Sequence, residues 1–331
     1  MKYQFPKLGA GTMLWLPKTE EEKQQYFRTF QYCLDNGLDF FDTAEVYGNG
    51  KVETLLGEFI RKDGRPVRIS SKFAPPSKMN PAAPKRKQAD RNSPEALSEA
   101  LDDTLRRLGL EHLDLYLMHT PPKNGNIDAY MEVMSRELEN GRIKAIGVCN
   151  HGKEQIEAAA KALEKRGHQL SAAMVGYNLL RRYPETNGVI DICNKYSVTL
   201  IPYAPLAEGT LTGKYRGERV PMKYFVTSYF GHLNLTQERD DAVPFIKRLF
   251  SKPLECDTKK IEPLMCTLEQ IAKKYDKSIA QVSLNWLVTN PKVAIFTIPG
   301  IRSEKQAESN LGALGWSLSA EDREIIDEAA L

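Results

Sequence analysis

The sequence predicts an α/β fold, a (β/α)8 barrel with a long insertion after its seventh strand. Short apolar runs alternate along the chain with segments of helical period, which predicts parallel strands joined by right-handed crossovers. Eight such runs are present, and eight parallel strands close a barrel. The alternative is an open doubly wound sheet, but GAGTML (9–14) does not fit the dinucleotide pattern GxGxxG, and GNGKVE (48–53) does not fit the phosphate-loop pattern. A barrel is therefore favoured, as a single domain over residues 1–331.

The predicted strands are short apolar runs bounded by turn residues. They cover residues 8–11, 38–43, 67–72, 113–119, 143–148, 172–177, 198–204 and 293–300. Segments with apolar residues at helical spacing are predicted as helices over residues 20–36, 52–61, 94–108, 128–140, 153–166, 187–196, 261–274 and 279–289. Ser93 before Pro94 is typical of a helix start, and Gly109 is typical of a helix end.

Two stretches interrupt this alternation, and both follow strands. Residues 74–94 are rich in proline and lysine, and a longer insertion runs from the end of the seventh strand to about residue 260. The basic run 85–87 is interpreted as part of a solvated loop rather than as a localisation signal. Because barrels carry their active sites on the loops that follow strands, both insertions are expected at that face.

Composition narrows the classes of function. The 331 residues carry a net charge of +3 at pH 7, which gives little support to nucleic-acid or membrane binding. Five cysteines without a CxxC pair indicate free thiols in a reducing compartment. The opening MKYQFPKLGAG lacks the apolar region of a secretory signal, so we expect a cytoplasmic protein. The plastid stroma stays open, because a removed transit peptide leaves no trace.

Polar side chains stand where three of the predicted strands end. Asp42 ends the second strand and Tyr47 lies in the loop behind it. Lys72 ends the third strand and His119 ends the fourth. Taken singly, each has an ordinary interpretation, such as a turn former, a packed ring or a solvated strand end. Because parallel strands in a barrel end at one rim, we expect the four side chains to lie together.

Elementary acid–base chemistry gives this set one task. A tyrosine, with an ordinary pKa near 10, is a weak acid at neutral pH, and a nearby ammonium such as that of Lys72 is expected to lower the pKa of Tyr47. Asp42 would hold the lysine in place, since an ion pair at ~4 Å gains about 4 kcal/mol at an effective dielectric constant near 20. His119 would donate to the same substrate oxygen. The rim is thus suited to protonate an oxygen that becomes anionic, as carbonyl reduction by hydride requires.

These residues lie in segments that resemble the aldo-keto reductases, and the resemblance spans essentially the whole chain. The matching segments are LGAGTMLW (8–15), FFDTAEVYGNGKVETLLGEFI (40–60), ISSKF (69–73), LDLYLMH (113–119), GRIKAIGVCN (141–150), YNLLRR (177–182), LIPYAPLAEGTLTGKY (200–215) and IPGIRSEKQAESNLGALGWSLS (298–319). The resemblance implies a barrel, a nicotinamide cofactor bound without a Rossmann motif, and the same four catalytic residues with Tyr47 as the acid. The long insertion resembles the branch that includes bacterial and plastid members and potassium-channel β-subunits.

The resemblance also implies a set of cofactor-binding residues. They are Gly11, Thr12, Met13, Asp42, Asn150, Tyr203, Leu206, Gly209, Leu211, Lys214, Arg302, Gln306 and Asn310. Asn150 is implied to hold the nicotinamide amide, and Tyr203 to stack on its ring. The chain departs from the family pattern at three positions, where Cys149, Met174 and Ser309 replace a serine, a glutamine and a glutamate.

The phosphates and the adenosine end are implied to bind at two further segments. Residues 206–214 would wrap the pyrophosphate, and Asn310 would lie at the adenine. Arg302 favours NADPH over NADH, because a guanidinium beside a helix N-terminus suits an additional phosphate. Gln306 has a second interpretation, since Ser303 and Gln306 also have the spacing of a capping box.

Aromatic residues and histidines are further candidates, for the substrate pocket and for a metal site respectively. The residues expected to line the pocket are Trp15, Phe73, Tyr224 and Tyr229. Core packing is an equal alternative for Phe73. We expect no metal site, because the remaining histidines have no mutual ligand spacing; they are His112, His151, His168 and His232.

The sequence therefore predicts an NADPH-dependent reductase of a small aldehyde or ketone, acting as a monomer or weak homo-oligomer. One alternative is a nicotinamide-binding regulatory subunit that senses redox state, like the channel β-subunits, which would also retain the four residues. A second is an isomerase barrel without a redox role. That alternative shares the fold but does not explain why Lys72 stands behind a tyrosine.

Overall fold

The structure is a computed structural model that describes residues 3–75, 91, 93–122, 124–216 and 259–330. Most of the predicted insertion after the seventh strand, including Tyr224 and Tyr229, lies outside the described residues. So does most of the proline- and lysine-rich stretch 74–94.

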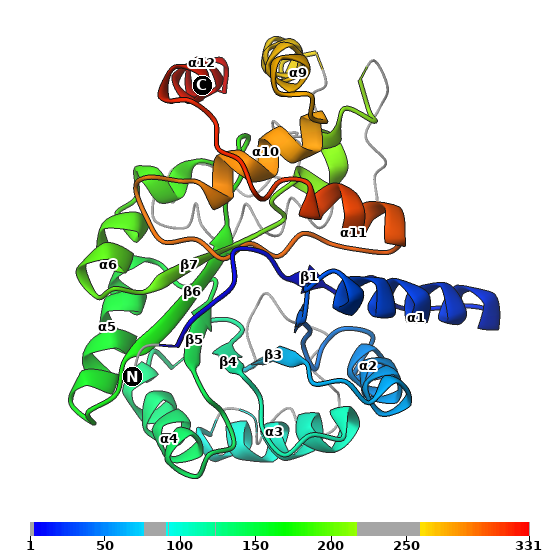
Figure 1. Ribbon diagram of the computed structural model, residues 1–331. Helices are drawn as coiled ribbons and strands as arrows, with labels where there is room; N and C mark the ends of the chain where they lie inside the picture. The colour runs from blue at the N-terminus through cyan, green and yellow to red at the C-terminus, as the bar shows by residue number, and fades with distance from the viewer. Residues whose placement is uncertain (1–2, 76–90, 92, 123, 217–258, 331) are drawn as a thin grey trace, which may run out of the picture.

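Seven parallel strands form a curled sheet in which each strand pairs with its neighbour in the chain (Figure 1). The strands are β1 (Ala10–Gly11), β2 (Phe40–Asp42), β3 (Arg68–Phe73), β4 (Leu115–Met118), β5 (Ile146–Cys149), β6 (Leu170–Gly176) and β7 (Thr199–Tyr203). The register pairs Asp42 with Ser70 and Phe73 with Met118. The carboxyl ends of β2, β3 and β4 are therefore adjacent, as the sequence predicts.

Residues 293–300, predicted as the eighth strand, do not form a regular strand. Isolated parallel bridges join Ile295 to Leu200 of β7, and Thr297 to Leu8 ahead of β1. The Leu200 amide donates to the Ala294 carbonyl at 2.9 Å. The segment thus bonds to the chain at both edges of the sheet, but it lacks the continuous ladder that a strand requires, and a proline at position 299 has no N–H to donate.

Most helices cover the outside of the sheet, whereas α9 (Glu262–Tyr275) and α12 (Ala320–Ala329) lie beyond α10 (Ile279–Val288), away from the strands (Figure 1). The helices are α1 (Glu20–Asp35), α2 (Lys51–Asp63), α3 (Glu95–Leu108), α4 (Ile127–Glu139), α5 (Lys153–Glu164), α6 (Val189–Lys195), α9 (Glu262–Tyr275), α10 (Ile279–Val288), α11 (Glu304–Leu311) and α12 (Ala320–Ala329), with the 3-10 segments η2 (Tyr183–Glu185) and η3 (Ala207–Thr212). Gly109 ends α3 with a φ of 71°, as expected for a glycine at a helix end. Within the described part of the chain, no helix has the length and apolar character needed to cross a membrane.

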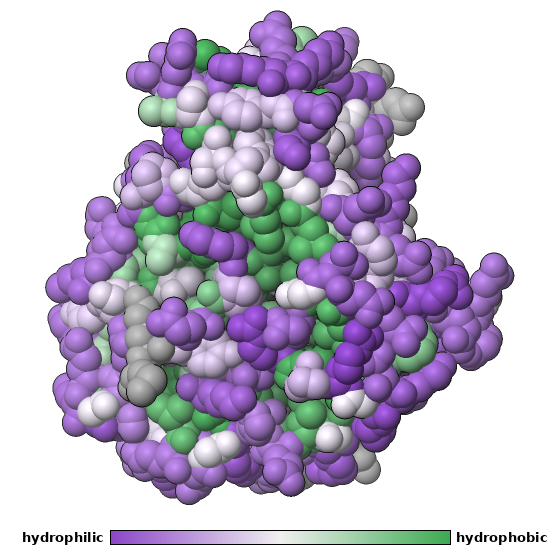
Figure 2. Space-filling view, viewed as in Figure 1, coloured by the Kyte–Doolittle hydropathy of each residue, from purple (hydrophilic) through white to green (hydrophobic). Residues whose placement is uncertain are grey.

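Apolar side chains pack in two clusters. A small cluster fills the interior of the curled sheet and includes Phe40, Leu117, Met174 and Phe296. A larger cluster lies between the sheet and the helices. Figure 2 shows apolar residues in the middle of the face seen in Figure 1 and polar residues around its margin.

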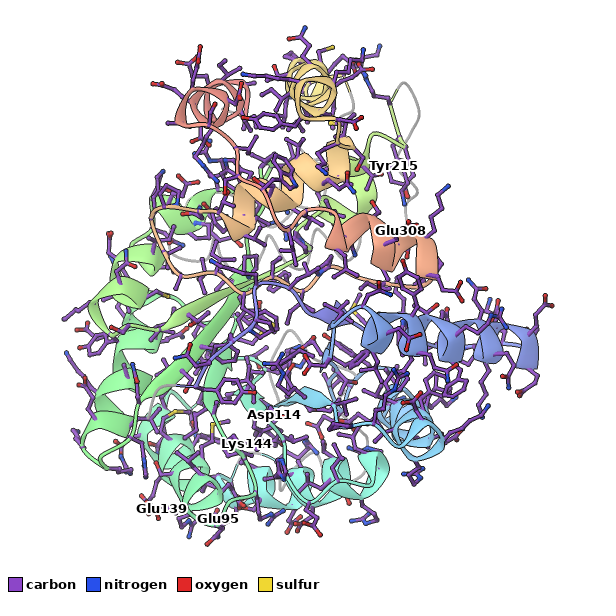
Figure 3. All side chains as sticks on the ribbon, in the orientation of Figure 1. Glu95, Asp114, Glu139, Lys144, Tyr215 and Glu308 are labelled. Carbon is purple, nitrogen blue, oxygen red and sulfur yellow. The ribbon has the colours of Figure 1, made fainter. Side chains whose placement is uncertain are left out.

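The amino ends of the strands are tied together by ion pairs and hydrogen bonds. Asp114, just before β4, accepts hydrogen bonds from Lys144 Nζ at 3.0 Å, from Tyr3 Oη at 3.2 Å and from the Ile69 amide at 3.0 Å. Asp114 and Lys144 lie next to one another in Figure 3. The hydrogen bonds and the ion pair of Asp114 therefore stabilise the amino end of the sheet. The predicted site residues lie at the opposite, carboxyl end.

Candidate active site

Lys72 lies on β3 and is the centre of the predicted site. Its Nζ donates to the two carboxylate oxygens of Asp42 at 2.8 and 2.7 Å, and to the Thr43 carbonyl at 2.7 Å. Only 1% of the side chain is exposed. Burial alone would lower the pKa of Lys72, but the negative charges of Asp42 and its neighbours raise it overall. The lysine therefore stays protonated at neutral pH.

Asp42 is held by groups that the sequence alone did not indicate. Its Oδ1 accepts a hydrogen bond from Ser70 Oγ at 2.7 Å, and its backbone carbonyl accepts from Thr12 Oγ1 at 2.7 Å. Ser70 and Lys72 are two residues apart on β3, so their side chains point to the same face of the sheet. That alternation was the signal from which the role of Ser70 could have been found.

Tyr47 lies in the loop between β2 and α2, and its Oη is 3.3 Å from Lys72 Nζ. The ammonium of Lys72 acts to lower the pKa of Tyr47, as the sequence predicts, but burial is the larger effect and raises this pKa to about 12. The predicted net lowering of the pKa is therefore wrong for the site as it stands. The reason is that desolvation of the Tyr47 hydroxyl exceeds the attraction of one cation.

His119 follows β4 and faces Tyr47, with the ring centres 6.3 Å apart and the planes at 83°. Burial, together with the charge of Lys72, lowers the pKa of His119 to about 3. The imidazole is therefore neutral at pH 7 and carries a single N–H. Its Nδ1 is buried and has no hydrogen-bond partner among the residues that the structure describes.

Asn150 and Tyr203 extend the site from β5 to β7. Asn150 Nδ2 donates to the His119 carbonyl at 3.0 Å, and Tyr203 Oη donates to Asn150 Oδ1 at 3.0 Å. Cys149 Sγ lies 3.3 Å from Asn150 Nδ2. Cys149 and Met174 both belong to the small interior cluster. The structure thus brings Asn150 and Tyr203 to the same rim as the four predicted catalytic residues.

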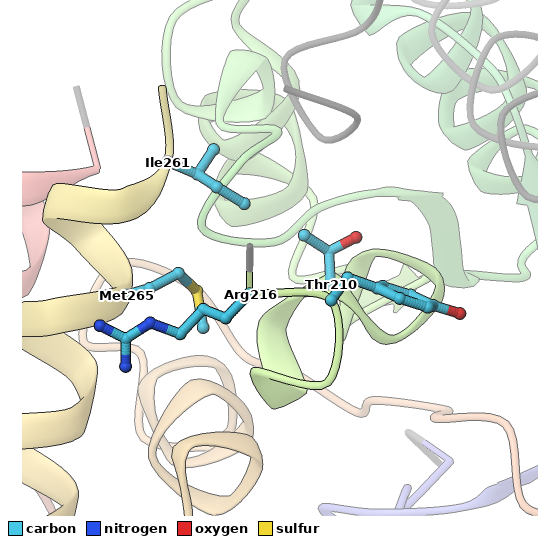
Figure 4. Close-up of a pocket in the computed structure, with 5 residues that line it drawn as sticks. Thr210, Arg216, Ile261 and Met265 are labelled. Atoms are coloured by element: carbon cyan, nitrogen blue, oxygen red, sulfur yellow. The ribbon is translucent and has the colours of Figure 1, made fainter. Parts of the chain in front are cut away.

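The loop after β7 contains the predicted pyrophosphate residues Leu206, Gly209, Leu211 and Lys214. Leu211 is fully buried, so neither its side chain nor its backbone is exposed in this structure. Lys214 Nζ folds over Gly209, where a Cβ atom would come within 2.5 Å of it. An ammonium against a glycine backbone at a turn is an arrangement that suits a phosphate. Beside this loop lies a hollow lined by Thr210, Tyr215, Arg216, Ile261 and Met265 (Figure 4).

Arg302, Gln306 and Asn310 form a second group at α11. Ser303 Oγ accepts from the Gln306 amide at 3.3 Å, and Gln306 Oε1 accepts from the Arg302 amide at 2.8 Å. Gln306 therefore stabilises the start of α11, in agreement with the alternative interpretation of Ser303 and Gln306 as capping residues. Asn310 is 3% exposed, and its Nδ2 has no partner in the described part of the chain.

The segment after β1 connects the two groups. Gly11, the last residue of β1, pairs with Asp42, Thr12 binds the Asp42 carbonyl, and Met13 is 41% exposed. Trp15 Nε1 then donates to the Ile301 carbonyl at 2.5 Å, next to Arg302.

Two of the residues expected to line the substrate pocket lie in the core. Trp15 is fully buried and stacks on Tyr26 at 5.6 Å. Phe73 is also fully buried, with its ring 6.0 Å from that of Tyr130. A pocket-lining role is therefore wrong for both side chains, and core packing, the alternative for Phe73, accounts for them.

Comparison with known proteins identifies the family of this chain. Residues 7–331 match the aldo/keto reductase family. The chain belongs to that family. The chloroplastic pyridoxal reductase of Arabidopsis thaliana is 31% identical over 98% of this chain and 82% of its own length. The NADP(+) aldo-keto reductase yakc of Schizosaccharomyces pombe is 30% identical over 98% of this chain and 89% of its own.

A solved structure of a relative supports the same fold for this aldo-keto reductase. The thermostable aldo-keto reductase Tm1743, solved with the inhibitor epalrestat, superposes with a TM-score of 0.70 at 26% identity. The match covers 98% of this chain and 95% of that one. The predicted family and the predicted enzyme class, an NAD(P)H-dependent oxidoreductase, are confirmed.

Proposed function

We propose that this aldo-keto reductase is an NADPH-dependent carbonyl reductase in which Tyr47 is the general acid. The observation that carries the proposal is the position of Lys72 Nζ, within hydrogen-bond distance of both Asp42 and Tyr47 Oη. We also propose that residues 1–331 form one domain, with the segment 293–300 in the place of an eighth barrel strand.

The residues present fit a nicotinamide dinucleotide phosphate. Asn310 Nδ2 is buried, has no partner among the described residues and is suited to a base edge, and Lys214 Nζ lies over a glycine at the loop after β7. Arg302 directly precedes Ser303, the N-cap of α11, and a guanidinium near this helix start would stabilise an additional phosphate. Asn150 and Tyr203 would hold the nicotinamide end next to Tyr47. NADP(+) is also in the name of the yakc relative.

When bound, NADPH supplies the hydride that adds to the carbonyl carbon. The residues of this chain protonate and orient the carbonyl oxygen of the substrate. Tyr47 gives its proton to the oxygen as negative charge develops there, and Lys72, 3.3 Å away, stabilises the phenolate that is left. A pKa of about 12 keeps Tyr47 protonated at neutral pH, so the proton is available when the oxygen becomes basic. Neutral His119 orients the same oxygen through its single N–H.

The first substrate to test is pyridoxal, an aromatic aldehyde. The proposal rests on the Arabidopsis relative, which is named for the reduction of that compound. A panel of aliphatic and aromatic aldehydes would accompany it, with oxidation of NADPH followed by absorbance.

Replacing Tyr47 with phenylalanine tests the proposal. In Y47F, kcat should fall about 1,000-fold, because general acid catalysis contributes ~10² to 10⁴. The Kd for NADPH, measured by fluorescence titration, should stay within about twofold of the wild-type value. Tyr32→Phe on α1 is the matched control and should turn over like the wild type. An unchanged kcat in Y47F would end the proposal, and failure of the wild type to turn over repeatedly would favour a redox-sensing subunit instead.

A further inference from the structure

The loop after β7 has an unfavourable backbone conformation. Ala204 has a φ of 50°, Ala207 of 48° and Glu208 of 50°, and Gly209 follows at 95°. Three of these four residues carry a Cβ, which makes the left-handed region costly. Such a conformation persists only where the surrounding structure holds it. The loop therefore needs an anchor outside itself.

Asn178 supplies that anchor from the turn after β6. It is fully buried, and its Nδ2 donates to the Ala204 carbonyl at 2.9 Å. Its Oδ1 accepts from the Leu180 amide at 2.8 Å, so both ends of the side-chain amide are fixed. Its backbone is fixed too, by paired hydrogen bonds to Arg181 at 2.9 and 3.2 Å. The donor that reaches Ala204 is thus rigid.

Ala204 stands between the two parts of the loop assigned to the cofactor. On one side, the ring of Tyr203 is set by the hydrogen bond of its Oη to Asn150. On the other, the Ala204 carbonyl also accepts from the Ala207 amide at 2.9 Å, which begins the turn leading to Gly209. Anchoring this single carbonyl fixes the orientation of the ring relative to the turn.

We propose that Asn178 is a positioning residue for NADPH: it holds the left-handed backbone at Ala204 and thereby orients Tyr203 and the turn at 206–209. The inference rests on the proposed function, because it concerns the same cofactor site. The hydrogen bonds of Asn178 in the described structure go to Ala204, Leu180 and Arg181 and not to the predicted catalytic residues. Its effect should therefore be on cofactor affinity rather than on the chemical step.

Asn178→Asp is the sharpest variant. The carboxylate keeps the size of the side chain and an acceptor for the Leu180 amide, but it has no donor for the Ala204 carbonyl. The Kd for NADPH should rise about tenfold, the value expected when one hydrogen bond to the partly buried Ala204 carbonyl is lost. At saturating NADPH, kcat should stay within about twofold. A residue that only stabilised the fold would lower the Tm and leave the Kd of the folded enzyme unchanged.

A second substitution tests the same link from the other side. In N178D/A204G, the glycine adopts the positive φ without a Cβ, so the affinity should return to within about threefold of the wild type. Ala204→Val leaves Asn178 intact and adds a β-branched side chain at the strained position, so it should weaken binding even if N178D does not fold. The control is N194D, because Asn194 Nδ2 also donates to a backbone carbonyl, that of Lys292 at 2.8 Å, ahead of the segment 293–300.

The outcomes distinguish the positioning role of Asn178 from the proposed reductase function. Weaker binding in N178D and A204V, rescue by A204G and wild-type affinity in N194D support the positioning role. Wild-type affinity in N178D, or an equal loss in N194D, overturns it while leaving the reductase function intact. A wild-type enzyme that does not bind NADPH overturns both.

Discussion

Lys72 and Asp42 form an ion pair inside the protein, with Nζ 2.8 and 2.7 Å from the two carboxylate oxygens. Lys72 is 1% exposed and Asp42 is 5% exposed. Solvent therefore screens neither charge, and each depends on the other for its stability. The pair anchors the ammonium on which the proposed chemistry at Tyr47 depends.

Removing one partner should destabilise the fold. D42N leaves a buried ammonium unpaired, so the free energy of unfolding should fall by about 3–5 kcal/mol, as measured by urea denaturation. The double variant D42L/K72M replaces both charges with apolar groups and should recover much of that loss. Glu58→Gln is the control, because it breaks the exposed Lys23–Glu58 pair and should cost less than about 1 kcal/mol. A loss in D42N no larger than in E58Q would contradict the assigned role of the pair.

The reduction rate should be insensitive to pH near neutrality. Tyr47 must be protonated to act, and with a pKa raised to about 12 it loses its proton only at strongly basic pH. His119 must be neutral, and with a pKa lowered to about 3 it gains a proton only in strong acid. The value of kcat/KM, which reports groups of the free enzyme, should vary less than about twofold between pH 6 and 9. A tenfold change per pH unit in that range would show that another group governs catalysis.

The sequence was sufficient to predict that the catalytic side chains lie together at the rim, because this arrangement follows from the topology of the strands. Once strands alternate with helices, Asp42, Lys72 and His119 must stand at the same end of neighbouring strands. It was not sufficient for the balance of effects on the pKa of Tyr47, because the desolvation of its hydroxyl depends on how distant segments of the chain pack around it. The lowering effect of Lys72 was predictable, but the larger raising effect of desolvation was not.

Contacts between residues far apart in the chain could not be predicted from the sequence either. Nothing in the local sequence links Asn178 to Ala204, which lies 26 residues later, or Trp15 to Ile301. The segment 293–300 has the composition of a strand, yet its pairing consists of isolated bridges. In each case the deciding contact is made by residues far apart in the chain, which periodicity does not detect.

Acid should destabilise the protein in part through His151. This side chain is 1% exposed, its Nδ1 lies 2.8 Å from the Cys149 carbonyl, and burial lowers its pKa to about 4. Because the unfolded pKa is about 6.5, the stabilising effect is complete above that pH and is lost as the pH falls toward 4. The wild type should lose up to about 3 kcal/mol more than H151Q over this range. H112Q is the control, and it should follow the wild-type curve when unfolding is measured at each pH.

Thiol reactivity should be confined to few cysteines. Cys33, Cys149 and Cys193 are buried, and burial raises the pKa of each to about 12. Cys266 is partly exposed. In C256S, which removes the cysteine outside the described residues, Ellman's reagent at pH 8 should titrate at most one thiol in the native state. All four remaining thiols should react in denaturant, and fast native reaction of Cys149 would contradict the burial of its side chain.

Asn310 offers a test in which stability and cofactor binding change in opposite directions. Its buried Nδ2 has no partner within the described structure, so in Asn310→Leu the free energy of unfolding should stay the same or rise by about 1 kcal/mol. The Kd for NADPH should nevertheless rise about tenfold, because the amide assigned to the adenine is gone. Asn285→Leu is the contrasting control. Asn285 Nδ2 donates to the Ala313 and Trp316 carbonyls, both at 2.9 Å, so its removal should lower stability by several kcal/mol. A less stable N310L with unchanged affinity would mean that Asn310 serves packing alone.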